Sequence, residues 1–349
     1  MKTSNGVKLL IVTQAVDRND PVLGFFCRWV EEFAKHFERI EVICLQEGKH
    51  ELPPNVRVHS LGKESSRQKA VGRRFVYAWR FLRLAWTLRH DYDAVFVHMN
   101  EEYVLLAGWL WKLLGKRIYM WRNHYAGSWR TNLAAAFCAK VFYTSKHSYT
   151  ARFKKAMLMP VGVDTERFKP DANLVRMPNS ILFLARMAPS KRPEMLLAAL
   201  NSLAHENREF TADFIGSPLP QDAAWYEVLK ERARAFGARV RFLPGVPNAE
   251  TPRLYQSHAV FVNASPSGMF DKTLFEAAAC GCAVLSSSKD FAALADPDTY
   301  FDSSETLAKR LTAVLERGAE RPLDTVVREH SLAALAVSLA AILKHGVPE

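Results

Sequence analysis

The chain has 349 residues and a formal net charge of +11, with 49% hydrophobic and 24% charged residues. This composition excludes a disordered or fibrous protein, and the length predicts two domains, because a single hydrophobic core stops growing at about 250–300 residues. No run of about 18 apolar residues marks a membrane-spanning helix, since Lys112 interrupts the longest candidate. The five scattered cysteines favour a reducing compartment, so we expect a cytoplasmic protein with Cys280 and Cys282 as core residues rather than metal ligands.

The first half of the chain alternates short apolar runs with amphipathic stretches, a pattern typical of parallel strands joined by helices. We expect six strands and a first Rossmann-like domain over residues 1–160. The strands are expected at KLLIVTQ, IEVICL, VRVHSL, DAVFVHM, RIYMW and KVFYTS.

The alternation stops where prolines, a glycine and charges gather, which predicts a linker over residues 161–175. It resumes over 176–322, where helices are expected to begin near Pro193, Gln221, Ala249 and Lys272. The last segment, 323–349, has apolar residues at helical spacing, so one or two packed helices are expected there. The strands of this second domain are expected at SILFLA, TADFIG, VRFLPG, AVFVNA and AVLSS. The predicted fold class is α/β, with two doubly wound domains.

Charge is distributed unevenly between the halves. Residues 1–172 hold 28 Lys and Arg against 16 Asp and Glu, whereas residues 173–349 hold 19 against 20. The first half therefore carries +12 and the second −1. This asymmetry indicates an anionic partner of the first half, with a membrane surface, a phosphorylated acceptor and nucleic acid as the candidates.

A basic, aromatic stretch at 67–89 is the main source of that charge, and it contains no acidic residue. A helix of this kind can lie in a bilayer interface, with aromatic rings at headgroup depth and basic groups near anionic lipid. Packing of a crossover helix explains its apolar residues but not its uniformly positive polar ones. Single-stranded nucleic acid also suits basic and aromatic residues, although no recognised motif supports it. The residues expected at the membrane or acceptor face are Arg73, Arg74, Trp79, Arg80 and Arg83.

Three segments contain candidate ligand-binding residues. Arg186 ends a strand and Lys191 precedes a helix, so two cations and a helix amino terminus could meet a pyrophosphate; solvated surface charge is the alternative. Glu276, in the early turns of a later helix, could accept both hydroxyls of a ribose, unless it is a plain surface glutamate. Gly24, in the turn after the first strand, could let backbone amides meet an anion, or could belong to an ordinary turn.

These segments resemble a known family. LFLARMAPSKRPEMLLAAL, MPVGVDTERFKP and FLPGVPNAETPRLYQSHAVFVNASPSGMFDKTLFEAAACGCAVL are similar, in order, to the family 4 glycosyltransferases of the GT-B fold. The resemblance implies two Rossmann-like domains facing across a cleft, with C-terminal helices packing back toward the first. It also implies a retaining, metal-independent transfer without a cofactor. The second domain would hold a UDP- or GDP-linked sugar, and the first a lipid or saccharide acceptor.

The resemblance assigns donor-binding roles residue by residue. Arg186 and Lys191 match the basic pair on the phosphates, and Glu276 matches the second glutamate of a paired motif, on the ribose. Gly268 replaces the first glutamate, so its contact to the sugar must come from elsewhere. The remaining donor-binding positions are Gly24, Gly216, Leu243 and Val246, with Met269, Phe270, Asp271 and Lys272 around the replaced glutamate.

His124 follows a first-domain strand in MWRNHYAGSW and resembles the family's active-site histidine; a structural histidine is the alternative. In such retaining enzymes the leaving phosphate itself takes the acceptor's proton, so no carboxylate nucleophile is needed. Two non-catalytic readings stay open: a nucleotide-sugar-binding subunit, because the first glutamate is missing, and a nucleic-acid-binding protein.

Overall fold

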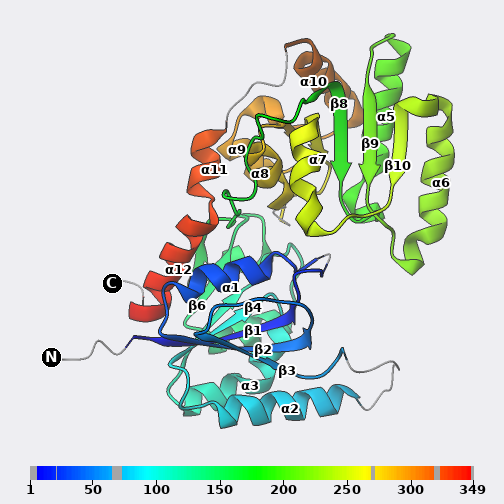
Figure 1. Ribbon diagram of the computed structural model, residues 1–349. Helices are drawn as coiled ribbons and strands as arrows, with labels where there is room; N and C mark the ends of the chain where they lie inside the picture. The colour runs from blue at the N-terminus through cyan, green and yellow to red at the C-terminus, as the bar shows by residue number, and fades with distance from the viewer. Residues whose placement is uncertain (1–5, 21, 65–72, 269–271, 318–322, 347–349) are drawn as a thin grey trace. The chain divides into compact units, whose positions relative to one another are not determined.

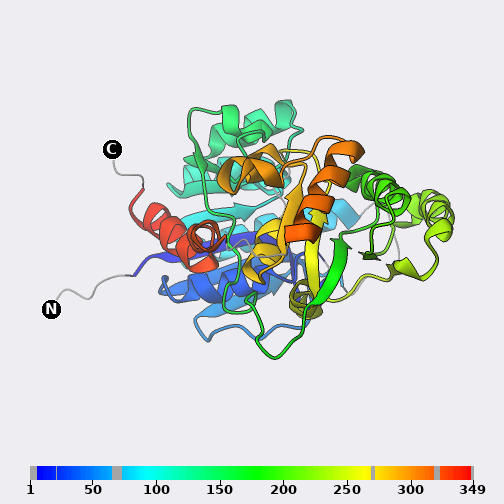
Figure 2. The same cartoon turned by 90° about the horizontal axis from the view of Figure 1, so that it is seen from above.

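Two compact units make up the protein (Figures 1 and 2), as seen in a computed structural model that describes all residues except 1–5, 21, 65–72, 269–271, 318–322 and 347–349. The first unit comprises Met1–Gly162 and Leu332–Glu349, and the second comprises Val163–Ser331. Each unit has its own parallel sheet covered by helices, which is the predicted α/β class. Within the described residues, no helix is long and apolar enough to cross a membrane.

The sheet of the first unit has seven parallel strands in the order β3-β2-β1-β4-β5-β6-β7. The six expected strands are present, and a seventh, β7, pairs with β6 at the edge through the register Val141↔Ala156. Three residues are too few to show a strand pattern in sequence, so backbone pairing alone reveals β7. The strands are β1 (Lys8–Val16), β2 (Arg39–Glu47), β3 (Val56–Ser60), β4 (Ala94–His98), β5 (Arg117–Trp121), β6 (Lys140–Tyr143) and β7 (Ala156–Leu158).

Helices cover both faces of this sheet (Figure 1). Alternate residues of the buried strands point to opposite faces: Leu9 and Ile11 pack with α1 and α12, whereas Leu10 and Val12 belong to a core shared with α2, α3 and α4. The helices are α1 (Phe26–Ala34), α2 (Arg73–Thr87), α3 (Glu101–Leu113), α4 (Trp129–Phe137) and α12 (Leu332–His345), with a 3₁₀ turn η1 (Tyr149–Arg152).

The C-terminal helix α12 belongs to the first unit, as the fold class predicts. It lies beside α1 (Figure 2), and the Tyr119 hydroxyl donates to the Ile342 carbonyl at 3.2 Å. Arg117 donates to the Lys344 carbonyl at 2.8 Å. The helix before it, α11 (Asp324–Glu329), instead packs with the second unit, where His330 meets the ring of Phe275.

The second unit has a five-stranded parallel sheet in the order β10-β9-β8-β11-β12. All five strands lie where the apolar runs predict them. The strands are β8 (Met177–Leu184), β9 (Thr211–Ile215), β10 (Val240–Leu243), β11 (His258–Asn263) and β12 (Ala283–Ser286).

Helices α5, α6 and α10 share one core with this sheet, and α7 packs on its other face, where Tyr255 meets Phe261 at 5.3 Å between ring centroids. The helix starts expected near Pro193 and Lys272 are correct. The helices are α5 (Pro193–His205), α6 (Ala223–Ala233), α7 (Thr251–Ser257), α8 (Lys272–Ala279), α9 (Lys289–Leu294) and α10 (Ser304–Arg317). Short 3₁₀ turns are η2 (Pro189–Lys191), η3 (Pro220–Asp222), η4 (Arg234–Arg239), η5 (Asn248–Glu250) and η6 (Pro297–Thr299).

Candidate active site

The loop between β8 and α5 holds both cations that the sequence assigns to a diphosphate. Arg186 follows the last strand residue by two positions and its side chain is exposed. Lys191 ends η2 and is half-buried, with its Nζ donating to the Ser265 hydroxyl at 3.1 Å. Because parallel sheets of this kind bind ligands at the carboxyl ends of their strands, the loop lies on the ligand-binding edge of the second unit.

Arg192 is a site residue that the sequence reasoning missed. Its backbone is left-handed, with φ +50°, a conformation that is uncommon for residues other than glycine. Its Nε donates to the Ala264 carbonyl at 2.7 Å, and its Nη2 donates to the Ser287 hydroxyl at 2.7 Å. One side chain thus joins the loop after β8 to the ends of β11 and β12. The polar triplet before Pro193 was the available signal, but only the fold shows which strand ends it reaches.

Buried polar side chains extend this network to α8. The Ser287 hydroxyl donates to the Ser265 carbonyl at 2.9 Å, and the Asn263 carboxamide oxygen accepts from the Ser265 amide at 2.8 Å. The Asn263 amide nitrogen donates to the Thr273 hydroxyl at 3.2 Å, in the first turn of α8. Asn263, Ser265 and Ser287 are all buried. Three loops of one sheet edge and the first turn of α8 are therefore fixed relative to one another, as preorganised binding requires.

Glu276 lies inside the second unit rather than on a helix surface, because its side chain is only 4% exposed. The Tyr255 hydroxyl donates to Glu276 Oε2 at 3.4 Å, from the facing helix α7. The reading of Glu276 as a plain surface glutamate is therefore wrong. A buried carboxylate in a fixed position can accept hydroxyl groups of a ligand that reaches it, which is the role the sequence proposes.

Lys272, the first residue of α8, shares this environment. Burial lowers the pKa of its ammonium group to about 8, although Glu276 and Asp164 act in the opposite direction. Arg167 reinforces the lowering. A cation whose charge is costly in the free protein is ready to be stabilised by an anionic ligand.

Three of the glycines that the sequence assigns to donor binding occupy positions where a side chain is disfavoured. Gly268 has φ +94°, so the glutamate that it replaces would be strained there. A Cβ on Gly216 would lie 1.8 Å from the Ala185 carbonyl oxygen, and a Cβ on Gly24 would lie 2.7 Å from the carbonyl oxygens of Arg18 and Asp20. The other three positions of that segment, Met269, Phe270 and Asp271, lie outside the described residues.

Leu243 and Val246 flank the end of β10, and both are half-buried. The Leu243 carbonyl accepts from the Gly216 amide at 3.0 Å, and the Gly245 amide donates to the Ser217 hydroxyl at 3.1 Å. The loops after β9 and β10 are thus joined, which places these two apolar side chains at the same sheet edge as Gly216.

The backbone amides of the turn around Gly24 donate hydrogen bonds within that turn. Asp20 Oδ1 accepts from the amides of Val22 and Leu23 at 2.8 and 2.7 Å, and the Gly24 amide donates to the Asp20 carbonyl at 3.0 Å. An anion at this turn would have to displace Asp20 from these donors.

His124 lies in the loop after β5 of the first unit and is half-buried. Its Nδ1 lies 3.0 Å from the Ala126 amide nitrogen and 3.2 Å from the Ala126 carbonyl oxygen, so this ring nitrogen is engaged within the loop. Its ring stacks on Tyr125 at 4.6 Å, and its carbonyl accepts from the Tyr149 amide at 2.8 Å. The imidazole is thereby held in one orientation with Nε2 available to a ligand.

The residues expected at the membrane face lie on α2. Arg74, Trp79 and Arg83 are exposed, and the Arg83 guanidinium lies 5.4 Å from the centroid of the Trp79 ring. Arg73 is half-buried, and Arg80 donates to the Leu61 carbonyl at 2.8 Å, so these two are less free to meet lipid.

The cysteines of the chain are all free thiols. All five thiols are buried, and burial raises the pKa of Cys27 to about 11 and that of Cys282 to about 12, which disfavours the reactive thiolate. The described part of the chain holds no cluster of three or more His, Cys, Asp or Glu side chains suited to a metal ion.

Two Rossmann-like units with polar loops at the carboxyl ends of their strands give the chain a GT-B-like fold. Residues 178–317 match the family model described as glycosyl transferases group 1. This matched stretch lies within the second unit, which is similar to the group 1 glycosyltransferases. No curated protein gives a significant match to the sequence.

Solved structures share the fold over almost the whole chain. HepE of Anabaena, solved with UDP and glucose, is 18% identical and has a TM-score of 0.69, with 97% of this chain and 95% of that chain covered. Sucrose-phosphate synthase of Thermosynechococcus elongatus is 17% identical with a TM-score of 0.72, covering 95% and 98%. The lipopolysaccharide outer core galactosyltransferase WaaB is 14% identical with a TM-score of 0.65, covering 96% and 99%. At these identities the likeness establishes the fold alone.

Proposed function

We propose that this enzyme transfers a hexose from a UDP- or GDP-linked donor to a lipid-linked or saccharide acceptor, with retention of configuration and without a metal ion or cofactor. The observation that carries the proposal is the network of Lys191, Arg192 and Ser265, which fixes the strand-end loops of the unit that matches the family. Fixed cations at a sheet edge are what a diphosphate leaving group requires.

In this proposal Arg186 and Lys191 bind the donor's diphosphate, and Glu276 accepts the ribose hydroxyls. Lys272 takes the place of the missing first glutamate, because Gly268 has no side chain to offer. The half-buried Leu243 and Val246 lie against the base. The roles follow from side-chain chemistry at one sheet edge together with the family's pattern.

His124 contacts the transferred sugar and the leaving phosphate through Nε2. The acceptor hydroxyl attacks the anomeric carbon on the face from which the diphosphate departs, and the departing phosphate oxygen takes the hydroxyl proton. The new glycosidic bond then has the donor's configuration. No enzyme carboxylate is consumed in this step, and the protein contributes position and positive charge.

UDP-hexoses are the first donors to test, because the structurally similar HepE was solved with UDP and glucose. A lipid-linked saccharide is the favoured acceptor class. WaaB, which has the same fold, is named for a lipopolysaccharide substrate, and the exposed α2 of this chain is basic and aromatic. We place the enzyme in the cytoplasm, peripheral on the inner membrane face.

A nucleotide-sugar screen by thermal shift, followed by NMR of the product's anomeric configuration, tests the proposal. A rise in melting temperature with one nucleotide-sugar, and a product of retained configuration, support it. Two results contradict it. Binding of a nucleotide-sugar without transfer or hydrolysis would make the protein a binding subunit, and stabilisation by oligonucleotides alone would indicate nucleic-acid binding.

A further inference from the structure

The three helices on one face of the first unit expose apolar side chains to solvent instead of the polar ones expected there. Four of the protein's eight tryptophans are at least half-exposed, and all four lie on α2, α3 and α4. Their exposed fractions are 60% for Trp79, 50% for Trp86, 50% for Trp109 and 69% for Trp129. Clustered exposed aromatic residues mark an interaction surface.

On α3 the exposed apolar residues form a regular stripe. Leu106, Trp109 and Leu113 are exposed at helical spacing, while Val104, Ala107 and Trp111 on the opposite side are buried in the core. Leu113 is 79% exposed. This helix is therefore apolar on both sides, which packing against the sheet does not explain.

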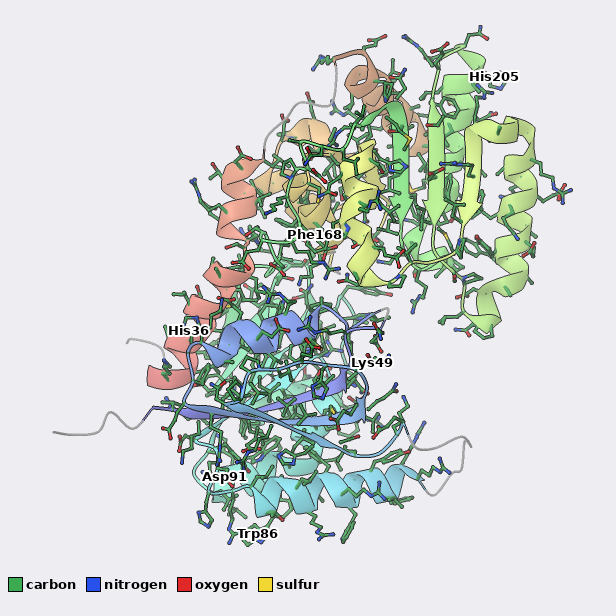
Figure 3. All side chains as sticks on the ribbon, viewed as in Figure 1. His36, Lys49, Trp86, Asp91, Phe168 and His205 are labelled. Carbon is green, nitrogen blue, oxygen red and sulfur yellow. The ribbon has the colours of Figure 1, made fainter. Side chains whose placement is uncertain are left out.

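The neighbouring helices carry similar stripes. On α2 the outward residues are Phe75, Trp79 and Trp86, and Figure 3 shows Trp86 on the side of α2 away from the sheet. On α4 they are Trp129 and Leu133. Because α3 contacts both α2 and α4, and all three pack inward on one core, the stripes share one outer surface. We name this surface the α2–α4 face.

Positive charge accompanies the apolar stripes. Arg74, Arg83, Lys112 and Arg130 are exposed on the same three helices. Arg83, Arg89 and Arg130 lie over the rings of Trp79, Trp86 and Trp129 at 5.4, 4.4 and 5.7 Å. The sequences of α2 and α4 contain no acidic residue, and α3 has only Glu101 and Glu102, in its first turn.

We infer that the α2–α4 face is a membrane-docking surface that lies flat on a bilayer containing anionic phospholipid, with α2, α3 and α4 parallel to the bilayer plane. Tryptophan rings and leucines enter the interface, and the arginines meet lipid phosphates. The inference rests on the proposed membrane association and extends it from one basic helix to three. A second copy of the chain fits less well, because a two-fold contact would press one basic face against another.

Docking in this way has a consequence for the acceptor. Each of the three helices begins at the carboxyl edge of the sheet, and Trp129 at the start of α4 follows His124 by five positions along the chain. The loop that holds His124 therefore lies at the rim of the docked face. A lipid-linked acceptor can then present its headgroup to that loop without leaving the bilayer.

Vesicle sedimentation tests the inference with a variant that leaves α2 intact: Trp109→Ser, Leu113→Ser and Trp129→Ser combined. The matched control exchanges exposed apolar residues of the second unit, Val175→Ser, Val228→Ser and Leu294→Ser. We expect the first variant to bind vesicles of phosphatidylcholine with phosphatidylglycerol at least about tenfold more weakly than wild type, and the control to bind as wild type. UDP-hexose hydrolysis in the absence of vesicles should be unchanged in both.

A second measurement follows tryptophan fluorescence, first in the wild type and then in a double variant. Lipids brominated near the headgroup should quench the tryptophan fluorescence of the wild type, and the Trp109→Ser, Trp129→Ser variant should lose a large part of that quenching. If the wild type binds vesicles, the triple variant binds equally well and the double variant keeps its quenching, the three-helix face is overturned and α2 remains as the anchor. Absence of wild-type binding would overturn the proposed membrane association itself. A wild-type dimer that the triple variant converts to a monomer would identify a second copy as the occupant.

Discussion

Arg192 shows how a single side chain can hold a ligand-binding edge together. Its left-handed backbone disfavours a side chain, yet its guanidinium reaches Ala264 and Ser287 on two different strand ends. The strain of the backbone is retained because the contacts of the side chain offset it. Sequence reasoning identified the neighbouring Arg186 and Lys191 but had no means of seeing a contact across about 70–100 residues of chain.

Substitutions of Arg192 should therefore weaken donor binding, because this side chain fixes the positions of the strand-end loops. Arg192→Gly suits the backbone but removes both hydrogen bonds, and we expect UDP affinity to fall by about tenfold in calorimetry. Arg192→Lys keeps the charge and loses the two-point contact, so it should also weaken UDP binding. Ser287→Ala, which removes one contact, should have a smaller effect. Wild-type affinity in the glycine variant would show that the network does not organise the site.

Donor binding should be coupled to proton uptake by Lys272. Its pKa is lowered to about 8, so part of its charge is absent at pH 8.5, and an anionic ligand nearby should raise that pKa. UDP binding at pH 8.5 should therefore take up a fraction of a proton, and Lys272→Met should abolish the uptake. Calorimetry in buffers of different ionisation enthalpy measures it. Equal uptake in wild type and variant would place Lys272 away from the bound nucleotide.

His124→Ala should lower turnover much more than it lowers UDP affinity, because the proposed contact of Nε2 is made to the sugar and the transition state. The kcat for UDP-hexose and the Kd for UDP, measured on the same preparation, separate these effects. If kcat is unchanged, the histidine serves only to order its loop through Ala126 and Tyr149.

At the scale of elements, apolar periodicity predicted eleven of the twelve strands of the two sheets because buried parallel strands are nearly continuous apolar runs. Strand β7 is recognised only by its pairing with β6, and the positive φ of Gly268 is seen only in the structure. The apolar outer stripe of α3 was also hidden, since the same residues read equally well as core in a helix of unknown orientation. Patterns reveal where an element lies, whereas the partner of each face depends on tertiary structure.

Strands β9, β10 and β11 are joined by a polar cluster whose strength depends on pH. Burial raises the pKa of Asp213, but hydrogen bonds from His258 and Arg241, at 3.2 and 2.6 Å to Oδ2, lower it below its usual value overall. A depressed folded-state pKa stabilises the protein above the unfolded pKa near about 4, and this stabilisation is lost as pH falls through the folded value.

Asp213→Asn should consequently lower the free energy of unfolding by about 1–3 kcal/mol at pH 7 and by less at pH 3. Urea unfolding at the two pH values, followed by tryptophan fluorescence, checks this. An equal loss at both pH values would mean that the carboxylate charge contributes nothing to the cluster.

Over the whole molecule, the uneven charge separates the tasks of the two units. Residues 1–172, which carry +12, include all but the C-terminal segment of the unit with the α2–α4 face. The near-neutral second half contains the residues that match the family model. Arg74→Glu with Arg83→Glu reverses exposed charges only, so it should reduce binding to anionic vesicles at low salt and leave UDP affinity intact. A matched loss of UDP affinity would show that these arginines serve the donor site.

The central claim is that the second unit binds a nucleotide-sugar diphosphate through fixed cations. Calorimetric titration of UDP-glucose and UDP-galactose into the wild type and the Arg186→Ala variant tests it most directly. We predict saturable binding of at least one of these donors to the wild type and roughly tenfold or greater weakening in the folded variant. Equal affinity in the two proteins would contradict the assignment of the site, and absence of binding by UDP- and GDP-sugars alike would contradict the proposed reaction.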